Sequence, residues 1–335
     1  MPALLDVQHL TVELPTSRGW VRPVHDVSLR IAAGETLGLV GESGSGKTML
    51  SLALMGLLPQ GAKIRGQAWL NASASAASKN LVALRENDWR AVRGGEIGMV
   101  FQEPMTSLNP VMRVGKQVAE AIRAHDPHAS RADLQRRTLK ALRRASVPEP
   151  ETRAEQFPHQ LSGGLRQRVM ISMALAAGPK LLIADEPTTA LDVTVQKQVL
   201  ALLAELRRAM QLGMLFITHD LGVVAQVADR VAVMYTGRVV EHGPVREVLT
   251  RPQHPYTKGL LAASPTLERG KFLPIPGIVP QLTDLPPGCA FAPRCPWRRV
   301  ECDAAVPELR AVNADHSARC VLVGEAVQAG HEACR

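Results

Sequence analysis

A glycine-rich stretch near the start of the chain has the residue types and spacing of a phosphate-binding loop. Residues 41–48 read GESGSGKT, which fits the pattern G-x-x-x-x-G-K-[ST], and they lie between a predicted strand and a predicted helix. Glycines let successive backbone N–H groups turn inward around phosphates, and the dipole of the following helix attracts the same anions. The predicted phosphate-binding residues are Gly41, Ser43, Gly44, Ser45, Gly46, Lys47 and Thr48.

A second element narrows the chemistry to hydrolysis. Residues 181–186 read LLIADE, four apolar residues of a predicted buried strand followed by two carboxylates. Asp185 at the strand tip suits Mg²⁺, as does the Thr48 hydroxyl, while Lys47 can reach the β- and γ-phosphates. Glu186 can polarise the attacking water as a general base. Two solvated acids at a strand end are the simpler alternative, which the apolar strand disfavours. The first motif alone predicts a P-loop NTPase.

The segment before this strand resembles a family signature. Residues 161–168 read LSGGLRQR, which is similar to the LSGGQ signature of the ABC ATPases, with Leu165 in place of the usual Gln. In that family the signature of one subunit closes over the ATP held by the P-loop of the other. The resemblance therefore implies that Ser162, Gly163 and Gly164 bind ATP across a dimer, as donors at a helix N-terminus can. Peptide-permease ATPases often have an apolar residue at the Leu165 position, so we expect an active site.

The same resemblance assigns further ATP-binding residues. Gln102 stands where the family has its Q-loop, touching Mg²⁺ or water and linking to membrane subunits. Residues 189–192 match the D-loop and contribute Asp192, and His219 matches the switch histidine that contacts the γ-phosphate. Trp20, the only aromatic residue upstream of the glycine-rich loop, is the candidate for stacking on adenine. The predicted catalytic residues are Lys47, Glu186 and His219.

Three segments specify the kind of ABC protein. Residues 103–110 read EPMTSLNP, residues 254–257 read HPYT, and residues 288–296 read GCAFAPRCP. Together they resemble the ATPases of the bacterial dipeptide/oligopeptide permease group, which also handles nickel and some glycans. The resemblance implies that this chain pairs with a second ATPase subunit, a paralogue rather than an identical copy. It also implies two transmembrane permease subunits and, indirectly, an extracytoplasmic substrate-binding protein. ATP closes the dimer, the membrane subunits switch access, and hydrolysis resets them.

The cysteines are confined to the last fifth of the chain: Cys289, Cys295, Cys302, Cys320 and Cys334. In a chain expected to stay in the cytosol, this clustering indicates metal or redox chemistry rather than disulfides. The first four are spaced C-x₅-C-x₆-C-x₁₇-C, and similar permease ATPases carry a [4Fe–4S] cluster at this pattern. Structural zinc is the competing interpretation, although paired C-x₂₋₄-C knuckles are absent; unliganded thiols are the third. A cluster would stabilise the loop-rich extension rather than transfer electrons, and Cys334 would not be one of its ligands.

Composition limits the remaining possibilities. The 335 residues include no apolar stretch approaching the roughly 20 residues that cross a bilayer, and the N-terminal sequence does not read as a signal peptide. We therefore expect a peripheral protein on the cytoplasmic face of the bacterial inner membrane. The net charge of +8 indicates solubility or membrane proximity more than nucleic-acid binding, because the few aromatic residues are not interleaved with basic ones. No nucleic-acid partner is expected.

The elements that must position these residues form an α/β pattern. Residues 4–14 and 22–31 alternate apolar and polar as half-buried strands, and strands then alternate with helices. This predicts a mainly parallel sheet with N-terminal antiparallel strands. Residues 230–243 predict a hairpin that turns at residues 236–237. The Pro-rich residues 274–287 predict a linker or irregular loop.

The predicted fold class is therefore the P-loop NTPase fold of the ABC ATPases with a small Cys/Pro-rich C-terminal extension. The nucleotide-binding domain is predicted at residues 1–250, with a helical subdomain inserted at about residues 103–179, and the extension at residues 251–335. Within the helical subdomain, Ser130 is a possible helix cap.

Two other functions compete with a transport motor. A soluble ABC ATPase acting on nucleic acid or ribosomes generally carries two nucleotide domains in one chain or long coiled-coil inserts, and neither is found here. A regulatory partner without catalysis is disfavoured because Lys47, Glu186 and His219 are intact.

Overall fold

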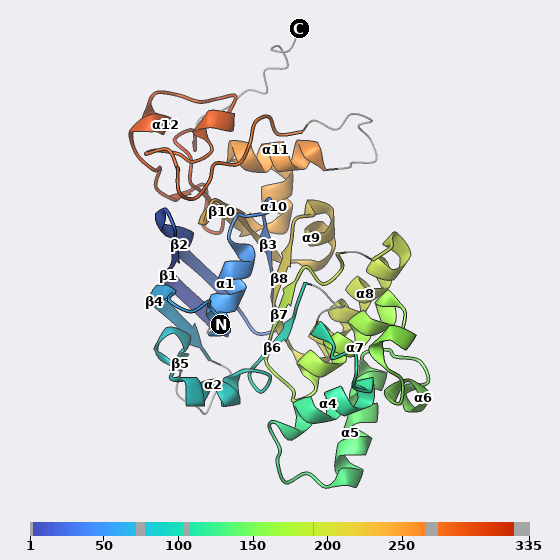
Figure 1. Ribbon diagram of the computed structural model, residues 1–335. Helices are drawn as coiled ribbons and strands as arrows, with labels where there is room; N and C mark the ends of the chain where they lie inside the picture. Colours follow the sequence, from blue (N-terminus) through green and yellow to red (C-terminus); the bar gives the residue numbers. More distant parts are fainter. Residues whose placement is uncertain (1–2, 72–77, 103–106, 190, 265–273, 325–335) are drawn as a thin grey trace.

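Two β-sheets organise the computed structural model (Figure 1). The structure describes residues 3–71, 78–102, 107–189, 191–264 and 274–324. Among these residues no helix combines the length and the apolarity that crossing a bilayer requires. Parts of three sequence features lie outside the described residues: the first half of the segment 103–110, residue 190 in the D-loop, and Cys334.

The larger sheet has the strand order β11-β12-β10-β9-β3-β8-β7-β6. Its parallel strands are β3 (Thr36–Val40), β6 (Ile97–Val100), β7 (Leu181–Asp185), β8 (Gly213–Thr218) and β9 (Arg230–Tyr235). The strands β3, β7 and β8 are buried along their whole length, which is why they read as continuous apolar runs. The predicted mainly parallel sheet is confirmed. Residues that follow β3, β7 and β8 gather at one edge, where carboxyl ends of parallel strands meet.

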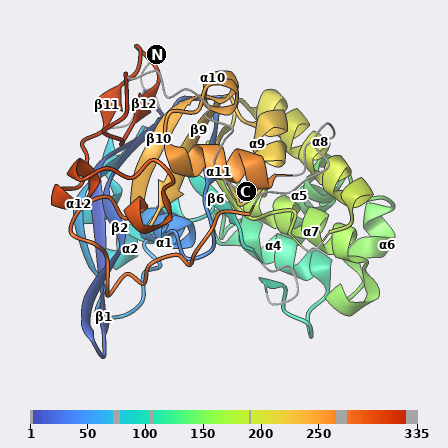
Figure 2. The same cartoon turned by 90° about the horizontal axis from the view of Figure 1, so that it is seen from above.

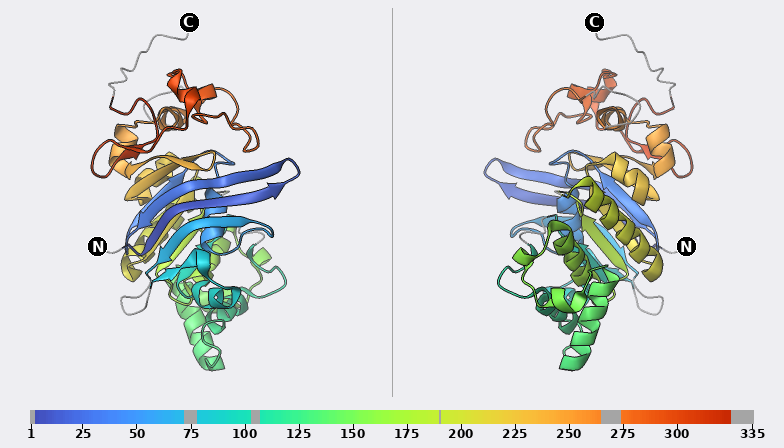
Figure 3. Two further views of the ribbon diagram at one scale, coloured as in Figure 1. Left: turned by 90° about the vertical axis from the view of Figure 1, so that its left-hand side faces the viewer. Right: turned by 90° about the vertical axis from the view of Figure 1, so that its right-hand side faces the viewer.

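The smaller sheet is antiparallel and has the order β2-β1-β4-β5. Its strands are β1 (Leu5–Thr16), β2 (Gly19–Ile31), β4 (Lys63–Leu70) and β5 (Lys79–Asn80). The left view of Figure 3 shows them as a curved layer on one side of the molecule. The N-terminal antiparallel strands are confirmed, whereas β4 was not expected from the sequence. Its residues KIRGQAWL lack a clean alternation, and Gly66 adopts a left-handed φ of 95°.

The inserted helices lie on the side of the large sheet away from the small sheet (Figure 1). The helix α1 (Lys47–Leu54) follows the glycine-rich loop, and α2 (Glu86–Val92) lies near the small sheet. The inserted helical part contains α4 (Val114–Arg123), α5 (Arg131–Arg144), α6 (Pro150–Ala154) and α7 (Gly163–Leu175). The Ser130 hydroxyl accepts a hydrogen bond from the Asp133 amide at 3.2 Å, so the predicted helix cap is confirmed.

Two more helices pack beside the large sheet, α8 (Val193–Met210) and α9 (Leu221–Val227). Short 3₁₀ turns occupy Leu81–Ala83, Pro158–Gln160 and Ala292–Arg294. Figure 3 shows the inserted helices projecting at the end of the molecule opposite the C-terminal extension.

The hairpin of β9 and β10 (Arg238–Pro244) turns where the sequence predicts it, because Thr236 and Gly237 have φ values of 42° and 86°. After it come α10 (Val245–Thr250), α11 (Pro255–Ala263), α12 (Glu301–Ala304), β11 (Arg310–Ala311) and β12 (Ser317–Ala318). The strand β12 pairs with β10, so the extension continues the large sheet. Two-residue strands carry no periodicity, which is why the sequence did not predict this pairing.

An aromatic cluster joins the extension to the rest of the chain. Phe291 is 2% exposed, and its ring centroid lies 5.4 Å from those of both Tyr235 in β9 and Tyr256 in α11. Aromatic pairs at such separations contribute beyond the area they bury. The extension is therefore packed on the main body, as Figures 1 and 2 show.

We expect Phe291→Ala to lower the free energy of unfolding by about 3–5 kcal/mol, because it leaves a cavity in this cluster. Urea denaturation followed by circular dichroism measures the change. Val300→Ala is the matched control, since Val300 is 85% exposed and its truncation should change the free energy by at most about 0.5 kcal/mol. Equal stability of the two variants would contradict docking through Phe291.

Candidate active site

The glycine-rich loop connects the end of β3 to the start of α1, as predicted. Gly44 and Gly46 have φ values of 77° and 102°, which non-glycine residues rarely adopt. A Cβ atom at Gly46 would also clash with the carbonyl oxygen of Pro23 in β2. The Gly237 amide, from the β9–β10 turn, donates to the Ser45 carbonyl at 2.9 Å. The loop is thus fixed against two segments distant in sequence, which holds its amides ready for an anion.

Lys47 lies inside this loop and is 6% exposed. Its Nζ donates to the carbonyl oxygens of Gly41 at 2.7 Å and Glu42 at 3.0 Å. Burial lowers the pKa of Lys47, and the carboxylates of Glu186, Asp185 and Glu42 act in the opposite direction. The ammonium group therefore lies within electrostatic reach of the two acids that end β7.

Asp185 is the stronger candidate of these acids for a metal ligand. It is 2% exposed, and its Oδ1 has no hydrogen-bond partner in the described part of the chain. Its Oδ2 accepts a hydrogen bond from the Ser51 hydroxyl at 3.3 Å, and the Thr48 hydroxyl also bonds this carboxylate. Burial raises the pKa of Asp185. A buried oxygen without a partner, next to a second hard oxygen donor, fits Mg²⁺.

Three side chains from separate segments surround Glu186. The Thr189 hydroxyl donates to its Oε2 at 2.8 Å, the Gln102 amide approaches Oε2 at 3.4 Å, and His219 Nδ1 lies 3.3 Å from Oε1. Glu186 itself has a φ of 48°, a strained conformation of the kind that gathers at functional sites. The structure thus brings together Glu186 and His219, which were predicted as catalytic, and Gln102, which was predicted to bind ATP and Mg²⁺.

Thr189 was not among the predicted site residues. The available signal was its position three residues after Glu186, within the segment that matches the D-loop. The D-loop resemblance assigns Asp192 instead. The Asp192 carboxylate accepts from the Val195 amide at 2.9 Å and caps α8, which is a sufficient structural role. Its contact with nucleotide stays a prediction.

The signature residues begin α7. The Ser162 hydroxyl accepts from the Leu165 amide at 3.4 Å, and Gly163 is the first residue of the helix. A Cβ atom at Gly164 would lie 2.5 Å from Val195 Cγ1, so glycine permits the close approach of α8. In both Figure 1 and Figure 2, α7 and α1 lie on different parts of the molecule. One chain thus carries the loop and the signature at separate places.

Trp20 is the predicted residue least connected to the others. It lies in the β1–β2 hairpin and is 49% exposed, with the Lys63 Nζ 3.9 Å from its ring centroid. One ring face is therefore in contact with a cation. Stacking of Trp20 on adenine stays a prediction.

The four predicted cysteine ligands are free thiols in the described extension. Burial raises the pKa of Cys289, and that of Cys295 to about 11, and each feels the charge of the other thiols. Within the described residues, no group of three or more His, Cys, Asp or Glu side chains is arranged to hold a metal ion. The spacing therefore gathers the thiols in one region without arranging them around a single ion.

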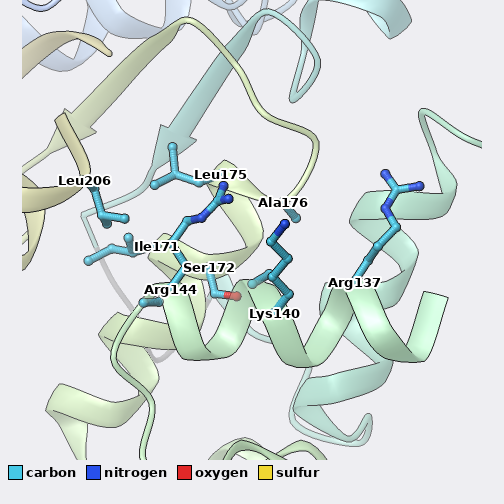
Figure 4. Close-up of a pocket in the computed structure, with 10 residues that line it drawn as sticks. Arg137, Lys140, Arg144, Ile171, Ser172, Leu175, Ala176 and Leu206 are labelled. Atoms are coloured by element: carbon cyan, nitrogen blue, oxygen red, sulfur yellow. The ribbon is translucent and has the colours of Figure 1, made fainter. Parts of the chain in front are cut away.

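A cavity of about 160 Å³ lies between α5 and α7 (Figure 4). Its lining includes Arg137, Lys140, Arg144 and the buried Ser172. None of the predicted nucleotide residues lines it, so it is separate from the ATP site.

The glycine-rich loop, the buried lysine and the two acids at the end of β7 define a P-loop NTPase. Residues 24–189 match the family model described as "ABC transporter", and residues 240–302 match "Oligopeptide/dipeptide transporter, C-terminal region". The second match includes Cys289, Cys295 and Cys302.

Curated relatives cover nearly the whole chain. The oligopeptide transport ATP-binding protein OppD of Bacillus subtilis is 51% identical over 87% of this chain and 81% of its own length. The dipeptide transport ATP-binding protein DppD of the same species is 46% identical over 96% of this chain and 95% of its own length. A Brucella ovis peptide import ATP-binding protein is 49% identical over 95% of this chain and 96% of its own length.

A solved dimeric ATP-binding cassette in a post-hydrolysis state, bound to ADP and Pi, is 27% identical to this chain. It matches with a TM-score of 0.62 over 72% of this chain and 99% of its own length. The chain belongs to the ATP-binding proteins of ABC transporters. It binds ATP and is an ATPase.

We expect Asp185→Asn to raise the midpoint of thermal unfolding at pH 7.5 without nucleotide. Burial raises the pKa of Asp185 when the chain folds, so the stabilising contribution is complete at low pH and is lost as pH rises through the folded pKa. The amide removes that loss at neutral pH. Each 1 kcal/mol gained corresponds to about 2–4 °C.

The same variant should lose the extra thermal stabilisation that Mg²⁺ gives with ATP, because one metal ligand is gone. Differential scanning fluorimetry at several pH values measures both effects, and the gain without nucleotide should disappear near pH 3. A variant with a lower midpoint at neutral pH, or with an intact Mg²⁺ response, would contradict this role for Asp185.

Proposed function

We propose that this chain is the ATP-hydrolysing subunit of a transporter that imports dipeptides or oligopeptides. The observation that carries the proposal is the pairing of two features in one chain. A hydrolytic site around Glu186 is followed by an extension whose residues 240–302 match the C-terminal region of oligopeptide/dipeptide transporters. Relatives named for oligopeptide, dipeptide and peptide transport support the same substrate class.

In the proposed reaction, Lys47 and the loop amides bind the phosphates, and Thr48 and Asp185 would hold Mg²⁺. When bound, Mg²⁺ neutralises charge on the phosphate oxygens. Glu186 accepts the proton of the attacking water. Its position is supported by the Thr189 hydroxyl at 2.8 Å, and His219 and Gln102 lie on either side of the carboxylate, within 3.4 Å.

We propose that the nucleotide is shared between two ATPase subunits. Support comes from the separation of α1, which follows the glycine-rich loop, and α7, which begins at the signature: the two helices lie on different parts of the molecule in Figures 1 and 2. The similar cassette with bound ADP and Pi is also a dimer. A paralogue is the proposed second subunit.

The proposed membrane partners are two permease subunits, with a substrate-binding protein on the other side of the membrane. Two large apolar side chains that flank the segment after Gln102 in sequence are exposed, Phe101 by 42% and Val111 by 80%. Exposed apolar side chains beside a catalytic loop suit contact with another protein. In this proposal the chain lies peripherally on the cytoplasmic face of the inner membrane and has no nucleic-acid partner.

We further propose that the extension binds a [4Fe–4S] cluster through its four cysteines. A single zinc ion would bring its sulfur ligands to about 3.8 Å from one another, given Zn–S bonds of about 2.3 Å. A cluster gives each thiolate its own iron, so the four sulfurs need not meet at a single ion. Backbone N–H groups reach every sulfur, and such bonds stabilise thiolate ligands. The donors are Phe291 to Cys289, Trp297 to Cys295, Arg299 to Cys302 and Leu322 to Cys320.

For the transport function, we expect Glu186→Gln to abolish peptide uptake while ATP binding persists. Removing a general base typically lowers the rate by about 10²–10⁴-fold. Uptake of a labelled dipeptide and tripeptide is measured in cells that lack the chromosomal copy and carry the variant. Glu205→Gln, an exposed acid on α8, is the matched control and should restore uptake.

Two outcomes would contradict this proposal separately. Full uptake by Glu186→Gln would remove the assigned role of this carboxylate. Normal peptide uptake in the deletion strain, together with loss of nickel or glycan uptake, would replace the substrate class and leave the ATPase site intact.

For the cysteines, we expect the anaerobically purified full-length chain to be brown, to contain about four iron atoms and to bleach on reduction. Cys302→Ser and Cys320→Ser should each lose the colour. Cys334→Ser is the control and should keep it. A colourless protein with one zinc per chain would contradict the cluster and favour the alternative site.

A further inference from the structure

One arginine of the extension reaches the glycine-rich loop. The Arg294 guanidinium forms a bidentate ion pair with Glu42, with Nη1–Oε2 at 2.7 Å and Nη2–Oε1 at 3.0 Å. Parallel bonds of this kind are the strongest and most directional ion pairs that side chains make. The two residues are 252 positions apart, and Glu42 is the second residue of the loop.

Contacts with other residues of the extension and with β9 fix the position of the Arg294 side chain. Its Nε donates to the Pro276 carbonyl at 2.9 Å, and its Nη1 lies 3.3 Å from the Tyr235 hydroxyl. The guanidinium also lies 5.9 Å from the Phe291 ring centroid, and Arg294 is only 6% exposed. The bonds with Glu42 raise the pKa of Arg294, so it is charged at every physiological pH. The extension therefore presents a fixed, buried cation to the loop.

Glu42 is in a position where its charge affects ATP. Its carbonyl accepts from the Lys47 Nζ at 3.0 Å, and its backbone N–H donates to the Tyr256 hydroxyl at 2.8 Å. Its carboxylate acts on the charge of Lys47, the residue expected to reach the β- and γ-phosphates. An uncompensated carboxylate in the phosphate-binding loop would repel a triphosphate.

We propose that Arg294 is a positioning residue of the ATPase, which neutralises and orients Glu42 so that ATP affinity depends on the docked extension. This rests on the ATP site proposed above. Arg294 acts through Glu42: within the described residues its side chain bonds to Glu42, Tyr235 and two backbone carbonyls of the extension, and not to Lys47, Asp185, Glu186 or His219. The extension is thereby a part of the nucleotide site, joined to it by charge as well as by packing.

The test is the dissociation constant of ATP for the full-length chain, measured by isothermal titration calorimetry. We expect Arg294→Met to weaken ATP binding about tenfold, since it leaves a carboxylate beside the phosphates, and the loss should shrink in 0.5 M salt. The double variant Glu42→Gln/Arg294→Met should recover most of the affinity, because the repelling charge is then absent. In ATPase assays with the partner subunits, the KM for ATP should rise while kcat stays the same.

Arg298→Met is the matched control. Arg298 is an exposed arginine of the same extension, paired with Asp303 at 2.8 Å and not with the loop, so its ATP affinity should equal that of the unmodified chain. Arg294→Lys keeps the charge but loses the bidentate geometry, and it should give an intermediate affinity.

The outcomes separate this inference from the proposed function. If Lys47→Ala leaves ATP binding unchanged, the assigned ATP site is wrong. If Lys47→Ala abolishes binding and Arg294→Met does not weaken it, only the inference is overturned. If Arg294→Met unfolds the chain, Arg294→Lys with unchanged ATP affinity overturns it. A double variant as weak as Arg294→Met would show that Arg294 is only a structural tether.

Discussion

A loop of backbone amides can hold a triphosphate only when its conformation is fixed, and the rest of this structure depends on that constraint. The loop following β3 is fixed from three directions: by Pro23 in β2, which lies against Gly46; by the Gly237 amide on Ser45; and by Tyr256 and Arg294 on Glu42. These contacts come from β2, from the β9–β10 turn and from the C-terminal extension. The antiparallel layer, the parallel sheet and the extension therefore all contribute to one anion site.

The sequence predicted the parts of this site that are local. Strand, glycine loop and helix are consecutive, and the buried strand β7 runs directly into Asp185 and Glu186, so spacing alone was sufficient. The turn at Thr236 and Gly237 could likewise be predicted from its local sequence. The parallel order of the central strands followed from their alternation with helices.

The sequence could not predict contacts between residues that are far apart in the chain and belong to no recognisable motif. The strand β4 mixes charged residues with a glycine, and β12 has two residues, so neither shows a period. Arg294 is one of many arginines in the chain, and only folding brings it to Glu42. Thr189 lay inside a recognised segment, yet its bond to Glu186 depends on the turn after β7.

Several unfavourable features converge where ATP is expected to bind. Asp185 has a buried oxygen without a partner among the described residues, Lys47 has a pKa lowered by burial, and Glu186 has a left-handed backbone. Each costs folding free energy without ligand, and phosphates and a cation are the groups that would relieve the first two. Bound ATP and its cation should therefore stabilise the folded chain in two ways, through the new contacts that they make and by removing these two costs. Such a site is suited to a motor, because the energy of binding is available to change the arrangement of subunits.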